Sequence, residues 1–223
     1  MPRWQDYIVY QHQDWLLLNK PAGFSVQNLM ALWSCEFTAF HPVHRLDKET
    51  TGLWLVALNS DANQALCRQF QERKVKKLYL AITSGKPNKK QGVIKGDMQR
   101  SRRSQWHLCR SQENPAITFF KSVGLGSGLR LVLCQPLTGK THQIRVALKS
   151  LGSAIAGDRI YAAANAQQFD RLYLHAYALA FEWQGQFFSF QCEPNSGDLF
   201  VSDECHSALG AFTDPLTYFE KGA

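Results

Sequence analysis

The stretch HRLDKETTGLWLVAL at residues 44–58 joins a charged segment to a continuously apolar one. From Thr51 to Leu58 it is rich in β-forming residues, and an apolar run of this length is consistent with a strand buried in a core. The charged part lies immediately before that strand, where a loop can hold polar side chains rigidly. The stretch therefore predicts a buried strand with a fixed polar loop at its entrance.

Further elements can be read on both sides of this strand. Apolar β-rich runs predict strands, and helical spacing of apolar residues predicts helices. The expected strands are 8–10, 16–18, 75–83, 117–123, 129–135, 172–183 and 187–192. One helix is expected from Ser60, as its cap, through Arg73, and another from Thr141 to Leu151, ending at Gly152. Residues 84–114 lack a sustained period and predict a long excursion or a loose hairpin, and the last thirty residues carry no strong signal.

Strands dominate this pattern, hairpins recur and few crossover helices separate the strands. This favours an α+β fold with a mainly antiparallel, mixed β-sheet and flanking helices. The 223 residues are enough for one large domain or two small ones. We expect a single domain over residues 1–223, with a core at about 14–194.

Positive charge is concentrated in one part of the chain. The formal net charge is +7, but residues 68–110 contain 13 of the 25 Lys and Arg residues and only two acidic ones, a local balance of +11. Such clusters occur on ordinary solvated faces, yet they also suit RNA phosphates, as at Arg73–Lys77 and Arg100–Arg103. Charge alone favours a nucleic-acid partner and says nothing about chemistry.

Two further features suggest the compartment. No stretch approaches about 18 uncharged apolar residues, and the first residues lack the apolar region of a secretory signal, so we expect a cytoplasmic protein without membrane contact. The six cysteines form no Cys-x-x-Cys pair, which disfavours a zinc ribbon or a thioredoxin-like motif. We predict buried, reduced thiols.

Asp47 is the first candidate for chemistry. It lies between Arg45 and Lys48, and a nearby cation favours an ionised carboxylate. The same arrangement is common in surface ion pairs, which are worth about 0–1 kcal/mol. Taken alone, the decapeptide His44–Leu53 would be read as such a pair.

The decapeptide does not stand alone. It resembles the signature of the RluA-type pseudouridine synthases, which reads His-Arg-Leu-Asp, two variable residues, then Thr-Ser-Gly. Further segments are similar to that family's motifs in the same order, over a span from Lys20 to Pro194. They are Lys20–Gly23, Lys77–Ala81, Thr138–Arg145, Gly157–Tyr161 and Leu174–Ala176. Two positions depart from the pattern: Thr51 replaces Ser but keeps the hydroxyl, and Lys140 replaces Arg, which loses the bidentate fork for phosphate.

This resemblance implies an isomerase that turns uridine in RNA into pseudouridine at a central active-site cleft. The reaction breaks the N1–C1′ bond, rotates the uracil and joins C5 to C1′, with no redox change, so no cofactor and no metal are needed. The family assigns the catalytic carboxylate to Asp47, which acts either at C1′ or on the C2′ proton. The resemblance does not decide between these routes.

The other site residues follow from the same resemblance. Arg145 would keep the carboxylate ionised, and Tyr79 would stack on the uracil and relay a proton. Arg45 would occupy the space left by the flipped base. Leu174 would pack against the flipped base itself. For Tyr79 and Leu174, filling the core is the competing interpretation. Substrate contacts are also expected from the remaining polar candidates, His44, His142, Lys77 and Lys140, and a structural role is open for His44, His142 and His175.

Two other interpretations remain open. His41, His44 and Asp47, with His142, could bind the metal of an RNA hydrolase, although the spacing is generic. A non-catalytic RNA-binding module could also retain this fold, although binding alone does not need the set formed by Asp47, Tyr79 and Arg145.

The RNA partner is not readable as a code, because selection of a site depends on RNA shape. We expect ribosomal RNA first, with transfer RNA possible, and a monomeric enzyme. Only nineteen residues precede Lys20, so we expect no N-terminal S4 domain, and RNA affinity would come from the basic stretch, including Arg100, Arg102 and Arg103.

Overall fold

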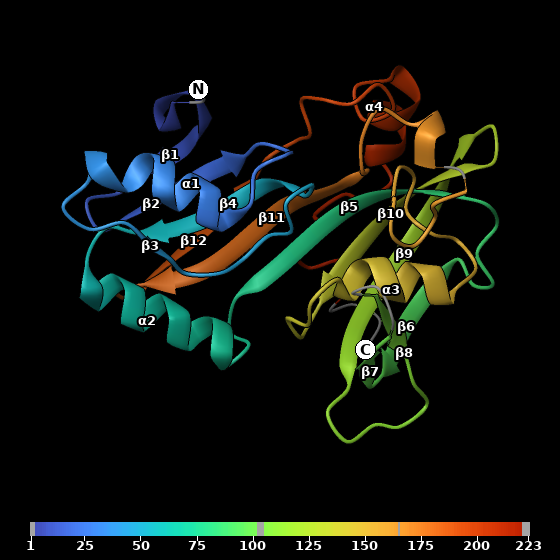
Figure 1. The fold of residues 1–223 in the computed structure, drawn as a ribbon, viewed down its shortest axis with the longest axis horizontal. Coiled ribbons are helices and arrows are strands. Elements are labelled where there is room, and N and C mark those ends of the chain that lie inside the picture. Colours follow the sequence, from blue (N-terminus) through green and yellow to red (C-terminus); the bar gives the residue numbers. More distant parts are fainter. Residues whose placement is uncertain (1–2, 102–104, 165, 220–223) are drawn as a thin grey trace. The chain divides into compact units, whose positions relative to one another are not determined.

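The computed structural model describes residues 3–101, 105–164 and 166–219, and the chain divides into two compact units (Figure 1). The first unit spans Met1–Lys76 and His175–Glu193, and the second spans Lys77–Leu174 and Pro194–Ala223. Each unit carries its own strands and helices. The single catalytic domain expected over residues 1–223 stays a prediction.

The first unit is built on a mixed sheet. Its strands pair in the order β1-β2-β4-β11, with β3 added to β4 and β12 to β11. The pair β4–β11 is parallel, whereas the other pairs are antiparallel. The strands are β1 (Ile8–Gln11), β2 (Trp15–Lys20), β3 (His41–Pro42), β4 (Thr51–Ala57), β11 (Leu174–Trp183) and β12 (Gln186–Gln191).

Strand β4 is the centre of this unit, because every one of its residues is buried. This confirms the buried strand predicted from the opening stretch. The strand begins beside β11, where Thr51 pairs with His175 and Gly52 with Ala176. Gly52 has φ +104°, and a Cβ there would lie 2.3 Å from the carbonyl oxygen of Ala176. Only glycine fits at this start of the strand.

Two α-helices belong to this unit, α1 (Val26–Trp33) and α2 (Ser60–Gln71), together with 3₁₀ turns at Trp4–Tyr7 and Ser34–Glu36. The predicted cap of α2 was wrong by one residue: the Asn59 side chain accepts the N–H of Ala62, and Ser60 is already helical. The helix also ends before Arg73, whose φ of 58° is left-handed. Helix α2 packs against β3 and β4.

The second unit holds an antiparallel sheet in the order β5-β10-β9-β6 and a separate hairpin, β7–β8. The strands are β5 (Lys76–Ser84), β6 (Gln91–Gly96), β7 (Met98–Arg100), β8 (Trp106–Leu108), β9 (Ala116–Gly126) and β10 (Leu129–Pro136). The excursion predicted at residues 84–114 therefore contains three strands. Strand β6 was missed because it is mostly exposed and shows little apolar alternation: of its residues, only Ile94 and Gly96 are buried.

Two α-helices complete this unit. Helix α3 (Gln143–Ser150) packs against β8, β9 and β10, and α4 (Asp203–Leu209) packs against β9 and β10. A 3₁₀ turn covers Ala166–Gln168. Helix α4 lies in the C-terminal part that gave no sequence signal. The predicted α+β class with a mixed sheet is confirmed.

Three smaller observations bear on the predictions. No helix in the described ranges is long and apolar enough to cross a membrane. All six cysteines are free thiols. Cys134 and Cys205 are buried as predicted, but Cys35 is exposed, so the prediction of burial was wrong there.

Candidate active site

Asp47 lies in the first unit, on the loop that connects β3 to β4. The loop turns tightly, since the N–H of Thr50 donates to the carbonyl oxygen of Asp47 at 3.1 Å. The neighbours Leu46 and Thr50 are buried, whereas Asp47 is half-buried and Arg45 is exposed. The loop thus presents the carboxylate and the arginine from a backbone that its buried residues anchor.

Lys20 ties this loop to the Lys-Pro-Ala-Gly turn. Its side chain is fully buried, and Nζ donates to the carbonyl oxygens of Pro21, Phe24 and Lys48 at 2.7–3.1 Å. The N–H of Gly23 donates to the same Lys48 oxygen at 3.1 Å. A buried ammonium is tolerated when such oxygens replace its water. The first motif of the chain therefore positions the residue directly after Asp47.

His44 has a structural role in this loop. Its Nε2 accepts the backbone N–H of Leu55 at 3.0 Å, and its carbonyl oxygen accepts the indole N–H of Trp54 at 3.2 Å. Its ring stacks on Phe70 with centroids 4.7 Å apart. Nε2 is thus already an acceptor, which disfavours His44 as a metal ligand. In the ranges that the structure describes, no group of three or more His, Cys, Asp or Glu residues could hold a metal ion.

The hydroxyl at position 51 supports the start of β4. Thr51 Oγ1 lies 2.8 Å from His175 Nδ1, and His175 Nε2 lies 2.8 Å from the carbonyl oxygen of Cys192. A carbonyl only accepts, so Nε2 carries the proton and the Thr51 hydroxyl donates to Nδ1. Because either Thr or Ser can make this bond, the departure at position 51 keeps the interaction. His175 is a buried structural residue.

In the second unit, Arg145 lies on α3 and forms a buried bidentate ion pair. Its Nε and Nη2 each lie 2.8 Å from a carboxylate oxygen of Asp158, and Arg145 and Asp158 are 7% and 1% exposed. Burial, the largest influence, would raise the pKa of Asp158, but hydrogen bonds from Arg145 and from the N–H groups of Tyr161 and Ile160 together lower it. Asp158 is therefore ionised and fixes the orientation of the guanidinium.

The role of Asp158 was missed by sequence reasoning. The residue lies in the quoted Gly-Asp-Arg-Ile-Tyr motif, but thirteen positions separate it from Arg145, and that spacing does not indicate contact. Gly157, just before it, has φ +75°, and a Cβ there would lie 1.7 Å from the carbonyl oxygen of Arg171. The close approach explains why this motif begins with glycine.

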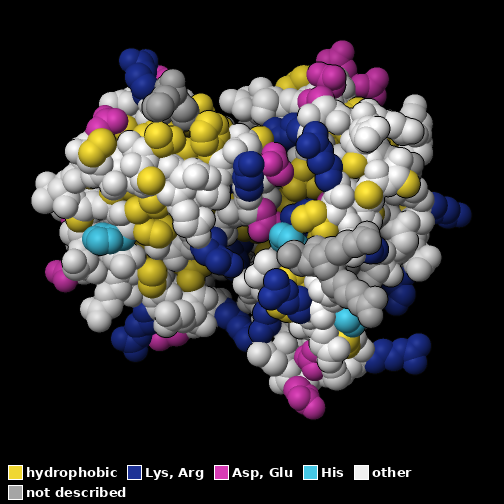
Figure 2. Space-filling model, viewed as in Figure 1, with side chains coloured by type: hydrophobic (Ala, Val, Ile, Leu, Met, Phe, Trp, Pro, Cys, Tyr) yellow, Lys and Arg dark blue, Asp and Glu magenta, His cyan; other side chains and the backbone are white. Residues whose placement is uncertain are grey.

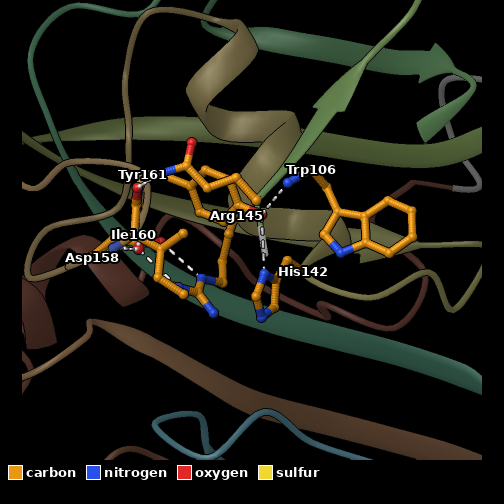
Figure 3. A network of polar contacts seen from close by, with 7 residues as sticks. Trp106, His142, Arg145, Asp158, Ile160 and Tyr161 are labelled. Atoms are coloured by element: carbon orange, nitrogen blue, oxygen red, sulfur yellow. Dashed lines mark hydrogen bonds and ion pairs between the residues drawn. The ribbon is translucent and has the colours of Figure 1, made fainter. Parts of the chain in front are cut away.

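Tyr161 and His142 surround this ion pair (Figure 3). The Tyr161 hydroxyl lies 3.0 Å from His142 Nδ1, and the ring centroid lies 5.2 Å from Arg145 Cζ, within cation–π range. His142 caps α3 with a left-handed φ of 56°. The motif residue Gln143 serves the fold: its amide bridges Thr138, the backbone N–H of Lys140 and β9, through Ile117 and Thr118.

The remaining predicted residues have diverse surroundings. Tyr79 is half-buried on β5, between the buried Leu78 and Leu80, so it points to the other face of the strand. Lys77 is half-buried and Leu174 is buried. Lys140 donates to the side-chain oxygen of Asn114 at 2.9 Å. Sequence reasoning had assigned no role to Asn114.

The basic stretch supplies exposed cations in the second unit, among them Lys95, Arg100 and Arg110. Arg102 and Arg103 lie outside the described residues. Figure 2 shows Lys and Arg side chains over the drawn face, including the part where Figure 1 places β7 and β8. The described part of the stretch therefore contributes positive charge to the surface.

The family model of the RNA pseudouridylate synthases matches residues 14–150. The chain belongs to this family. An RNA pseudouridine synthase of Haemophilus influenzae is 45% identical over 202 residues, which cover 87% of this chain and 90% of that protein. The ribosomal large subunit pseudouridine synthase C of Rickettsia bellii is 36% identical over 186 residues, which cover 77% of this chain but only 62% of that longer relative.

A solved structure supports the same assignment. Human RNA pseudouridylate synthase domain containing 1 matches with a TM-score of 0.73 at 28% identity, covering 84% of this chain and 83% of that one. The predicted family, fold class and enzyme class are thereby confirmed. This synthase is an isomerase that acts on uridine in RNA.

Proposed function

We propose that this synthase converts specific uridines of structured RNA, with ribosomal RNA favoured and transfer RNA as the alternative, and that Asp47 is its catalytic carboxylate. The observation that carries the proposal is the loop of Asp47. Buried Lys20 and half-buried His44 anchor its backbone, and Asp47 itself is only half-buried. A fixed, partly accessible carboxylate is what attack at C1′ or removal of the C2′ proton requires.

The reaction needs three further functions, which we assign by family motif. Tyr79 stacks on the uracil and relays the proton that leaves C5 after C5 has bonded to C1′. Its half-buried place on β5, away from Leu78 and Leu80, supports this role over core filling. Arg145 supplies the positive charge that the family motif pairs with the catalytic carboxylate, and its guanidinium fork is held by Asp158.

Base flipping is assigned to the exposed Arg45, whose planar guanidinium can stack where the base was. Leu174 packs against the flipped uracil. Four further residues are assigned to substrate binding: Lys77, Lys140, His44 and His142. Of these, His44 acts indirectly, by holding the backbone of the Asp47 loop. Unstacking a base costs a few kcal/mol, so contacts with the flanking RNA must supply that free energy.

The RNA target is inferred from charge and from a relative. The local balance of +11 over residues 68–110 suits a large folded RNA, and the Rickettsia relative is named for the ribosomal large subunit. An RNA substrate and six free cysteines support work in the cytoplasm. We infer a monomer that needs neither a metal nor a cofactor.

The test is transcriptome-wide mapping of pseudouridine in three strains: wild type, a strain lacking the chain, and one carrying Asp47→Asn. We expect the same sites to disappear in both altered strains, and their identity names the substrate. The Asn variant should bind RNA with unchanged affinity, because the fold and the cations remain.

Two results would contradict the proposal in different ways. Sites that persist with Asp47→Asn but vanish without the chain would remove Asp47 from the chemistry. If no site changes in any strain, a non-catalytic RNA-binding role replaces the enzymatic one.

A further inference from the structure

The β7–β8 hairpin is a small, separate sheet in the second unit. Its described residues form three cross-strand pairs, of which Arg100↔Trp106 is the last along β7. A two-stranded hairpin has marginal stability alone in water. Its position must therefore be set by the surface on which it docks.

That docking surface is the loop of residues 158–161. The backbone N–H of Trp106 donates to the Tyr161 hydroxyl at 3.0 Å, and the Gln105 side chain donates to the carbonyl oxygen of Ile160 at 3.1 Å. Strand β8 also packs against α3, the helix that carries Arg145. The hairpin is thus attached to the loop that contains Asp158.

The Tyr161 hydroxyl is hydrogen-bonded to two residues, Trp106 and His142. Its oxygen accepts the backbone N–H of Trp106 at 3.0 Å and lies 3.0 Å from His142 Nδ1, where the tautomer of the ring sets which group donates. This bond holds a histidine whose left-handed backbone is strained, with φ 56°. One buried hydroxyl therefore joins the hairpin to the residue that begins α3.

The rest of Tyr161 contacts the Arg145 ion pair. The ring lies 5.2 Å from Arg145 Cζ, and the backbone N–H donates to Asp158 Oδ1 at 3.0 Å. Asp158 accepts from Arg145 through both carboxylate oxygens. Figure 3 shows Tyr161, His142 and Arg145 together with Trp106 at one end of this network.

We propose that Tyr161 is a positioning residue that couples RNA binding on the β7–β8 hairpin to the orientation of Arg145 and His142. The exposed Arg100 lies across from Trp106 and fits an RNA phosphate. Phosphate contact there steadies the hairpin, and the Trp106–Tyr161 bond transmits that order to the ion pair. The inference rests on the proposed function of Arg145 and adds the route by which bound RNA acts on it.

The test is a double-mutant cycle of Arg100→Gln and Tyr161→Phe, with total RNA from cells lacking the chain as substrate. Tyr161→Phe keeps the ring but removes the hydroxyl and its hydrogen bonds to Trp106 and His142. We expect it to lower the single-turnover rate about tenfold while RNA affinity changes less than about twofold. Arg100→Gln should lower affinity and rate, each about threefold, in the parent, but affinity alone in the Tyr161→Phe background.

Tyr173→Phe is the matched control. Tyr173 is also buried in the second unit, and its hydroxyl also accepts a backbone N–H, from Leu199, and donates to a side chain, Asp170. Its loss should leave the rate within about twofold and the effect of Arg100→Gln on rate intact. Multiplicative effects of Arg100→Gln and Tyr161→Phe on the rate, or an unchanged rate in Tyr161→Phe, would overturn the coupling.

A second measurement needs no turnover. Hydrogen exchange of the 142–161 segment is followed in the Asp47→Asn protein with and without the same RNA. We expect RNA to protect this segment when Tyr161 is present and not in Tyr161→Phe. Equal protection in both proteins would overturn the coupling. An inactive wild-type enzyme would contradict only the proposed function, because this measurement does not depend on turnover.

Discussion

The loop of Asp47 and the helix of Arg145 are fixed by different interactions. In the loop, side chains bind the main chain: Lys20 donates to three carbonyl oxygens, and His44 Nε2 accepts the backbone N–H of Leu55 on β4. On α3, a side-chain carboxylate holds a side-chain guanidinium. The first arrangement orients a backbone and leaves its exposed side chains Lys48 and Glu49 replaceable. The second depends on the charge of two named side chains.

The largest effect is expected from the ion pair. Asp158→Asn removes the carboxylate that Nε and Nη2 of Arg145 each contact at 2.8 Å, and breaking a buried pair costs about 3–5 kcal/mol of the free energy of unfolding. Chemical denaturation measures this loss, and single-turnover kinetics should show a lower rate in the folded fraction. Glu72→Gln is the control, because its pairs with Arg68 and Lys74 are at the surface and worth about 0–1 kcal/mol. Equal losses in the two variants would mean that the buried pair contributes nothing special.

A smaller effect is expected in the loop. Lys20→Met keeps the aliphatic stem but removes the donor to three carbonyl oxygens, and a buried acceptor left without a partner costs about 1–3 kcal/mol. Because water can reach part of this loop, we expect a total loss of about 2–3 kcal/mol of unfolding free energy. The neighbouring Lys48→Met, at an exposed side chain, should be within about 0.5 kcal/mol of wild type. A stable Lys20→Met protein with full activity would contradict the assigned role of the first motif.

The smallest expected effect is a difference between the ion pair on α3 and the Asp47 loop in how their contributions to the free energy of unfolding depend on pH. The pKa of Asp158 is lowered in the folded state, so its stabilising contribution is present above the unfolded value of about 3.9 and is lost as pH falls through the lower folded value. The difference in unfolding free energy between wild type and Asp158→Asn should therefore be constant from about pH 9 to pH 5 and shrink below about pH 4. The difference for Lys20→Met should not follow this acid window, since no carboxylate is lost. A constant Asp158 difference down to pH 2 would show that its pKa is not set by folding.

Local patterns predicted what depends on neighbours in the chain. Apolar runs and turn residues predicted the β4 strand, the hairpin of β11 and β12, and the end of α3, which was predicted at Leu151 and lies at Ser150. Strand β6 was not predicted, because its buried face is created by pairing with β9, whose partner residues lie 20 to 30 positions away in the chain, from Gly96↔Ala116 to Gln91↔Lys121. Helix α4 is also defined by packing on β9 and β10 rather than by its own sequence.

By itself, the sequence determined the family, the enzyme class and the loop that carries Asp47, because ordered motifs and an apolar run are local properties of a chain. Only the tertiary structure decided that Asp158 holds Arg145, that Lys20 binds the carbonyl after Asp47, and that Tyr161 joins the hairpin to His142. These contacts join residues 13 to 55 positions apart. Hydrogen bonds and ion pairs act over about 3 Å in space, and linear spacing does not reveal which distant side chains the fold brings to that distance.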